Sequence, residues 1–161
     1  NIGYVVDLDF YIYEQLLRAM KRWKKAGKEL FTISTNFSRR NFESGGKNFA
    51  GRLKRMADHY GIDPKYIEVE VTESVVVENV DELKRVLSEL EKFGFRIAID
   101  DFGTGYSSLG VLLEIPADVV KIDKSFTDRI NLKEQRNFVS QMGNFIHSAK
   151  EEVILIQPQL M

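Results

Sequence analysis

Strand and helix patterns alternate along this chain, and that alternation limits the possible folds more than any other feature. Each strand-plus-helix unit spans about 25 to 35 residues, and no long polar linker or low-complexity segment separates the units. Successive parallel strands must be joined by a crossover connection, so this rhythm predicts a parallel sheet covered by helices. The predicted strands lie at residues 30–36, 66–71, 95–99, 118–123 and 153–156.

Helices are predicted wherever apolar residues recur at steps of three or four. Asp9 is the expected N-cap of the first helix, which continues to Ala26 and buries Ile12, Leu16, Met20 and Trp23. Further helices are expected near residues 49–60, 79–93, 107–113 and 134–149. A closed barrel of eight such units typically needs ~250 residues. The chain has 161, so we expect part of a barrel.

Composition excludes several classes of protein. The residues are 43% hydrophobic and 29% charged, which suits one globular domain or part of one. Lys and Arg number 23 against 24 Asp and Glu, so no overall positive field attracts nucleic acid and no DNA partner is expected. Cysteine is absent, which excludes disulfides and thiolate metal sites and is compatible with a cytoplasmic setting. No apolar run approaches the ~20 residues of a membrane span, so a soluble chain is expected.

Polar residues close four successive predicted strands. Asn36 ends the first, Glu70 lies near the end of the second, and Asp100 with Asp101 follows the third. Lys121 lies near the end of the fourth strand. Because the carboxyl ends of parallel strands share one rim, these side chains are expected to meet. By itself the acid pair is more typical of a turn, and it is the other three strand ends that favour a site.

These residue types suit a hard cation. Carboxylate and amide oxygens, without His or Cys, are typical ligands of Mg²⁺, Mn²⁺ or Ca²⁺. Asp100 and Asp101 could reach two ions, and two ions ~3.5 to 4 Å apart activate a water and neutralise a phosphate during in-line displacement. Lys121 would then orient or polarise the attacking water. Glycoside hydrolysis also uses two acids, but there they flank a sugar at ~5 to 9.5 Å from each other, so metal-assisted phosphodiester cleavage is favoured.

At these residues the sequence resembles the EAL-domain family of bacterial cyclic-di-GMP phosphodiesterases, which are variants of the TIM barrel. The similarity covers roughly residues 1–150 and is carried, in matching order and spacing, by Ser34-Thr35-Asn36-Phe37-Ser38, Glu68-Val69-Glu70-Val71-Thr72-Glu73-Ser74, the run from Asp100 to Leu109, and Val120-Lys121-Ile122-Asp123-Lys124-Ser125-Phe126. The run from Asp100 to Leu109 is highly specific. The resemblance implies an α/β, TIM-barrel-like (β/α) domain, with about five of its eight strands in this chain.

The resemblance also implies roles for individual residues. Asn36, Glu70 and Asp100 would hold metal, Asp101 would serve a second metal, and Lys121 would position the nucleophilic water. A further implied role is that of Glu73, which would steady the loop after Asp101; a capping or turn acid is an equal alternative for it. The candidate metal ligands are therefore Asn36, Glu70, Asp100 and Asp101, and the candidate catalytic residues are Lys121, Asp101 and Glu73.

The implied reaction opens one phosphodiester of cyclic di-GMP to give linear pGpG. The implied cofactors are two Mg²⁺ or Mn²⁺ ions, with Ca²⁺ as an inhibitory ion. The loop after Asp101 lies near a dimer interface in the family, so a homodimer is implied. A bacterial cytoplasmic location and attached sensory or GGDEF domains are implied as well.

Two departures from the family pattern matter. No Glu-Ala-Leu tripeptide occurs in the chain, and we expect this motif, which carries a metal-binding glutamate, upstream of Asn1. The family's later Glu-Gly-Val-Glu segment is also absent, and Gln157-Pro158-Gln159 follows the strand where that segment would be expected. We therefore interpret residues 1–161 as a single partial EAL domain, inactive by itself.

Two other functions remain open. An EAL-like receptor or dimerisation scaffold would bind the dinucleotide or pair with a partner without cleaving, and the missing glutamates are compatible with it. An unrelated metal-dependent hydrolase of the same barrel class is a third possibility.

Overall fold

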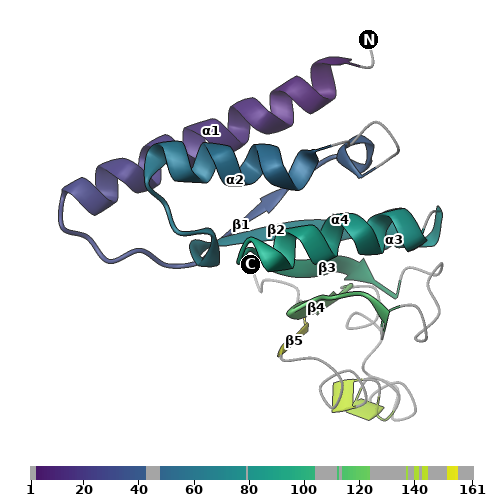
Figure 1. The fold of residues 1–161 in the computed structure, drawn as a ribbon. Coiled ribbons are helices and arrows are strands. Elements are labelled where there is room, and N and C mark those ends of the chain that lie inside the picture. The colour runs from purple at the N-terminus through teal and green to yellow at the C-terminus, as the bar shows by residue number, and fades with distance from the viewer. Residues whose placement is uncertain are drawn as a thin grey trace.

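The structure, a computed structural model, describes residues 3–42, 48–78, 80–103, 112, 114–123, 137, 140, 141, 143, 144 and 152–155. The helices are α1 (Gly3–Lys25), α2 (Phe49–Tyr60), α3 (Glu73–Glu78) and α4 (Val80–Lys92). The strands are β1 (Ile33–Asn36), β2 (Ile67–Thr72), β3 (Arg96–Phe102), β4 (Val119–Ile122) and β5 (Glu152–Leu155). Figure 1 shows α2 lying alongside α1, with the sheet beneath them.

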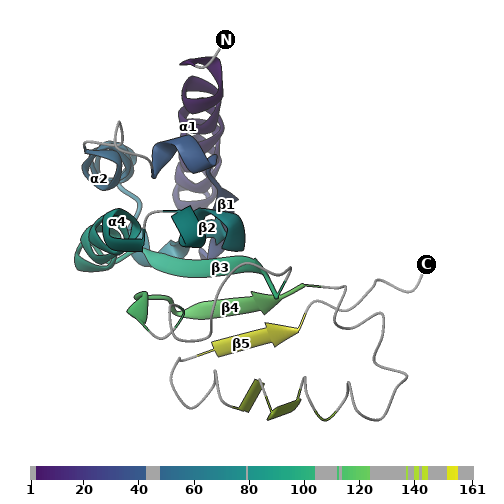
Figure 2. The ribbon, with the colours of Figure 1, turned by 90° about the vertical axis from the view of Figure 1, so that its right-hand side faces the viewer.

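The five strands form one sheet in the order in which they occur in the chain. Every neighbouring pair, from β1·β2 to β4·β5, is parallel. Figure 2 shows β3, β4 and β5 lying side by side with their arrowheads toward the same edge of the sheet. The predicted parallel α/β architecture is therefore confirmed, and the carboxyl ends of the strands share one rim.

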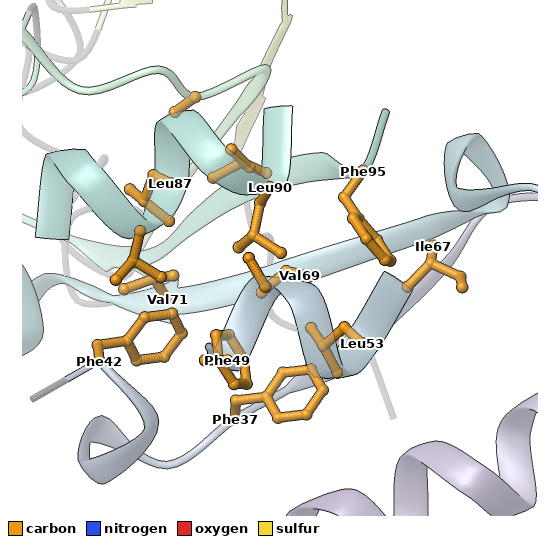
Figure 3. Close-up of a cluster of buried hydrophobic side chains, with 14 of the residues drawn as sticks. Phe37, Phe42, Phe49, Leu53, Ile67, Val69, Val71, Leu87, Leu90 and Phe95 are labelled. Carbon is orange, nitrogen blue, oxygen red and sulfur yellow. The ribbon is translucent and has the colours of Figure 1, made fainter. Parts of the chain in front are cut away.

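Side chains alternate between the two faces of the sheet, and one face carries the apolar core. Ile67, Val69 and Val71 of β2 are fully buried against the helices, where α2 supplies Phe49 and α4 supplies Leu90 (Figure 3). Burial of one such side chain contributes about 1.5–3 kcal/mol. The intervening residues of β2, Glu68 and Glu70, project from the opposite face.

Helix α1 differs from its prediction in two ways. It begins at Gly3, so Asp9 lies inside the helix and the predicted N-cap was wrong. Of the predicted stripe, Met20 is fully buried and Leu16 and Trp23 are partly buried against the core, but Ile12 is 51% exposed. Phe10, Tyr13 and Leu17, which were not predicted, are buried as well. The cause is that apolar residues occur on both sides of this helix. Their spacing alone therefore does not determine which side is buried.

Asp9 binds the segment that follows β1. Its Oδ2 accepts hydrogen bonds from the backbone N–H of Ser38, at 2.9 Å, and from Nδ2 of Asn41, at 2.6 Å. The carboxylate thus joins helix α1 to the segment that follows β1.

The other predicted elements agree within a few residues at their ends, with three exceptions. β1 is shorter than predicted and begins at Ile33, β3 is longer and extends through Phe102, and α3 was not predicted. The predicted helices at 107–113 and 134–149 lie mostly outside the described residues. In the part of the chain that the structure describes, no helix combines the length and apolar character that a membrane span requires.

Candidate metal centre at the strand ends

The sheet register brings the polar strand ends together. Asn36 of β1 lies opposite Glu70 of β2, and Thr72 lies opposite Asp100 of β3. Directly paired residues of parallel strands project from the same face, so the amide and the carboxylates share the face opposite the helices. Asn36 is exposed, Glu70 is buried and Asp100 is half-buried.

A β-bulge in β3 determines how the two adjacent aspartates lie. Between the pairs Ile99 with Val120 and Phe102 with Ile122, β3 has one residue more than β4. The extra residue reverses the alternation, so Phe102 belongs to the core, as Ile97 and Ile99 do. Asp101 adopts φ 56°, a left-handed conformation that Asp tolerates better than most residues. In a regular strand Asp100 and Asp101 would project to opposite faces, and the bulge removes that constraint.

Lys121 of β4 forms ion pairs with two carboxylates of β2. Its Nζ contacts Oε1 of Glu70 directly and lies 3.7 Å from Oε1 of Glu68. These three side chains are 15%, 7% and 9% exposed, respectively. The structure thus brings Lys121 to Glu70, as predicted from the strand ends, and adds Glu68, which had not been selected.

Carboxylates crowd around Asp101. Partial burial raises the pKa of Asp101, and its like-charged neighbours Asp100, Asp123, Glu70 and Glu73 raise it further. Such a cluster is stabilised by a cation. Asp123 was missed in the choice of site residues, although it directly follows β4 and the argument from strand ends would have found it.

Glu73, the first residue of α3, is buried and contacts the start of the next loop. Its Oε2 accepts a hydrogen bond of 2.9 Å from the backbone N–H of Gly103. Gly103 has φ 100°, which favours glycine. The contact joins the end of β2 to the end of β3, two residues after Asp101. The rest of the predicted dimerisation loop, residues 104–110, lies outside the described residues.

The donor set fits a hard divalent cation as part of a coordination shell. Asn36, Glu70, Asp100 and Asp101 would coordinate through oxygen, and the carboxylates around Asp101, which together with its partial burial raise its pKa, carry negative charge that a cation would offset. Within the described residues, no three His, Cys, Asp or Glu side chains are grouped closely enough to hold a metal ion by themselves. Further ligands would therefore have to complete the shell.

Comparison with known proteins adds independent findings. A family model described as "EAL domain" matches residues 1–155. The chain is 40% identical over 128 residues to "Signaling protein YkoW" of Bacillus subtilis (strain 168), covering 80% of this chain and 16% of that protein. It is 32% identical over 124 residues to "Cyclic di-GMP phosphodiesterase NbdA" of Pseudomonas aeruginosa, covering 77% of this chain and 16% of that protein.

Solved structures show the same fold. One described as "PaMucR Phosphodiesterase, c-di-GMP complex" superposes with a TM-score of 0.84 at 25% identity, covering 98% of this chain and 64% of that one. The TIM-barrel-like fold class predicted from the sequence is thereby confirmed. The chain spans about a sixth of the length of each curated relative named here.

Proposed function

The chain belongs to the EAL domain family, and on this premise we propose that the protein that carries it is a phosphodiesterase that hydrolyses cyclic di-GMP to linear pGpG. One observation carries the proposal: the ends of β2, β3 and β4 bring Glu70, Asp101 and Lys121 into one charged cluster. The description of a relative at 32% identity as a cyclic di-GMP phosphodiesterase supports the choice of substrate.

We propose Asn36, Glu70, Asp100 and Asp101 as ligands of two Mg²⁺ or Mn²⁺ ions. When bound, such ions acidify a coordinated water and neutralise charge on the phosphate. We propose that the remaining ligands come from parts of the same EAL domain outside the described residues. Ca²⁺, which prefers larger and less regular shells, is expected to bind there without supporting turnover.

The chain's own side chains then have distinct tasks. We propose that Lys121, which is ion-paired with Glu70, donates a hydrogen bond to the attacking water and offsets negative charge beside the phosphodiester. Glu73 holds the backbone that follows Asp101 through Gly103. Because that loop continues from the site, we propose that it also forms the contact between two copies in a homodimer.

The proposed setting is the bacterial cytoplasm, with sensory or GGDEF domains attached to the same protein. A relative at 31% identity is described as a bifunctional diguanylate cyclase and cyclic di-GMP phosphodiesterase, which supports this domain arrangement. The numbers of basic and acidic residues are nearly equal, so the net charge of the chain is close to zero. An anionic ligand would therefore be held by residues of the site and not attracted by the molecule as a whole.

The test is incubation of the full-length protein with cyclic di-GMP and Mg²⁺ or Mn²⁺, followed by chromatography of the nucleotides. Formation of pGpG that EDTA abolishes would support the proposal, and D101N should reduce the rate by at least about 100-fold. Tight binding of cyclic di-GMP without turnover by the folded protein would instead identify a receptor. The absence of a grouped acidic triad within the described residues makes this the second candidate.

A further inference from the structure

We propose that Glu68 is a positioning residue that holds the Lys121 ammonium from a point on β2 farther from the rim than the candidate metal ligands. The inference rests on the proposed phosphodiesterase function, since it concerns how Lys121 is presented to the reaction. Glu68 is not among the candidate metal ligands. It lies two residues before Glu70 on β2, on the same face of the sheet and farther from the rim.

Burial is the first observation behind this proposal. The side chain of Glu68 is only 9% exposed, and a carboxylate is costly to bury unless it is paired. Glu68 also lies farther from the rim than Glu70, so contact with a ligand at the rim does not account for its charge. The burial of this charge therefore calls for a partner on the same face of the sheet.

The Glu68 carboxylate has partners on three other strands of the sheet. Its Oε1 accepts a 2.7 Å hydrogen bond from Oγ of Ser34 on β1, and its Oε2 lies 3.5 Å from Nε of Arg96 on β3. Lys121 Nζ on β4 lies 3.7 Å from Oε1. A carboxylate anchored from both neighbouring strands is a rigid anion toward which a flexible lysine can be oriented.

Lys121 needs the Glu68 carboxylate because its other partner is Glu70. Glu70 contacts the ammonium directly, and Glu70 is also a proposed metal ligand. A cation bound to Glu70 would offset the charge that attracts Lys121 and repel the ammonium. Lys121 has four rotatable carbon–carbon bonds and about 2 kcal/mol of rotamer entropy to lose, so it needs a second carboxylate to stay in one place. In the described part of the chain, Glu68 is the other carboxylate paired with it.

The experiment compares kinetics of full-length variants. E68Q keeps the shape of the side chain and removes its charge. We expect it to lower kcat by about 10- to 100-fold, because a misplaced group near the reacting atoms costs rate, while KM and Mg²⁺ affinity change by less than about twofold. In a K121M background, E68Q should cause no further loss, because Glu68 acts through Lys121.

R96Q is the matched control, because it removes the other charged partner of Glu68 without touching the Glu68–Lys121 contact. If Glu68 serves only to balance charge in the interior, R96Q and E68Q should lower kcat and thermal stability alike, and the double variant should recover both. Three results would each overturn the proposal: a normal kcat in E68Q, an equal further loss of kcat when E68Q is added to K121M, or recovery of kcat and thermal stability in the E68Q/R96Q double variant.

A second readout does not depend on turnover. In protein labelled with ¹⁵N-lysine and saturated with Mg²⁺, the Nζ resonance of Lys121, assigned with K121M, should be sharp in the unmodified protein and broadened in E68Q. Identical resonances would overturn the Glu68 proposal. Absence of pGpG with normal Mg²⁺ binding and a sharp Lys121 signal would instead overturn the proposed function alone.

Discussion

Asp101 is the residue at which backbone conformation and charge are most closely linked. Its left-handed φ and the bulge place it with Asp100, and burial and neighbouring carboxylates raise its pKa above the ordinary 3.8. A raised pKa means that the folded chain binds a proton at Asp101 more readily than the unfolded chain does. The ionised carboxylate therefore opposes folding. This penalty is absent below the unfolded pKa and grows as the pH rises through the folded pKa.

The first prediction follows from that sign. In EDTA, D101N should melt at a higher temperature than the unmodified protein at neutral pH, and the difference should disappear as the pH falls below about 4. Thermal melts of the full-length protein across this range measure the effect. Saturating Mg²⁺ should reverse the order, because the ion stabilises the unmodified site more. D81N, which removes an exposed acid in the first turn of α4, should give no gain at any pH.

Glu73 leads to a second prediction. E73A would leave the N–H of the half-buried Gly103 without its carboxylate acceptor, so we expect a loss of about 1–3 kcal/mol in the free energy of unfolding. E73Q retains an oxygen acceptor and should lose less. Urea denaturation of the full-length variants measures both. Equal losses in E73A and E73Q would show that the hydrogen bond to Gly103 is not what Glu73 contributes.

Individual site residues differ in how far the sequence predicted their positions. Glu70 was placed correctly because alternation with Val69 and Val71 puts it on the face opposite the core. Alternation fails at Asp100 and Asp101, because the bulge shifts which residues of β3 face the core. The sequence feature that marks the bulge is the pair of acids followed by Phe102, which is buried. Glu68 was passed over because a strand pattern does not say which buried acid has partners across the sheet. The proposed roles of Asn36, Glu70, Asp100, Asp101, Lys121 and Glu73 stay predictions.

At the scale of elements, Asp9 joins helix α1 to the segment that follows Asn36 at the end of β1. The two hydrogen bonds that its Oδ2 accepts, from Ser38 and Asn41, involve a charged acceptor and are among the stronger kind. The same segment then leads to the buried Phe42, whose ring packs edge-on against Phe49 of α2 (Figure 3). The Asp9 carboxylate therefore links the position of α1 to the segment that directly follows Asn36, a residue of the candidate site.

The third prediction tests that link. D9A should lower the free energy of unfolding by about 1–3 kcal/mol, because the Asn41 amide, which is buried, loses its charged acceptor. D7A is the matched control: it removes an exposed acid from the same helix and should change stability by no more than about 0.5 kcal/mol. Chemical denaturation of both full-length variants compares them. A D9A protein as stable as D7A would contradict the role given to Asp9.

Elements were predicted well where one face is plainly apolar and poorly where it is not. Helix α4 has a clean stripe of buried residues at Leu83, Val86, Leu87 and Leu90, and its predicted bounds differ by one residue at each end. The stripe of α1 was predicted only in part, because Tyr11 and Ile12 are apolar yet exposed. The short α3 was missed because six residues contain too little periodicity to distinguish a helix from a turn.

At the scale of the whole molecule, apolar surface and open strand edges distinguish this chain from a closed barrel. Among the described residues, β1 pairs with β2 on one side only, so its other backbone edge is available to another strand. Helix α1 also exposes five apolar side chains: Tyr4, Val5, Leu8, Tyr11 and Ile12. Open strand edges and contiguous apolar patches both favour association with another chain.

The fourth prediction concerns the 161-residue chain expressed by itself. It should self-associate and show no turnover of cyclic di-GMP, because its apolar helix face and strand edge find partners in other copies before a closed site can form. Light scattering across a concentration series measures the association. L8E should reduce the association, because it removes apolar surface, whereas Q15E adds the same charge to a polar position of the same helix and should have little effect. A monodisperse preparation that forms pGpG with Mg²⁺ would show that residues 1–161 make a working site without further carboxylates, and the requirement for additional metal ligands would then be wrong.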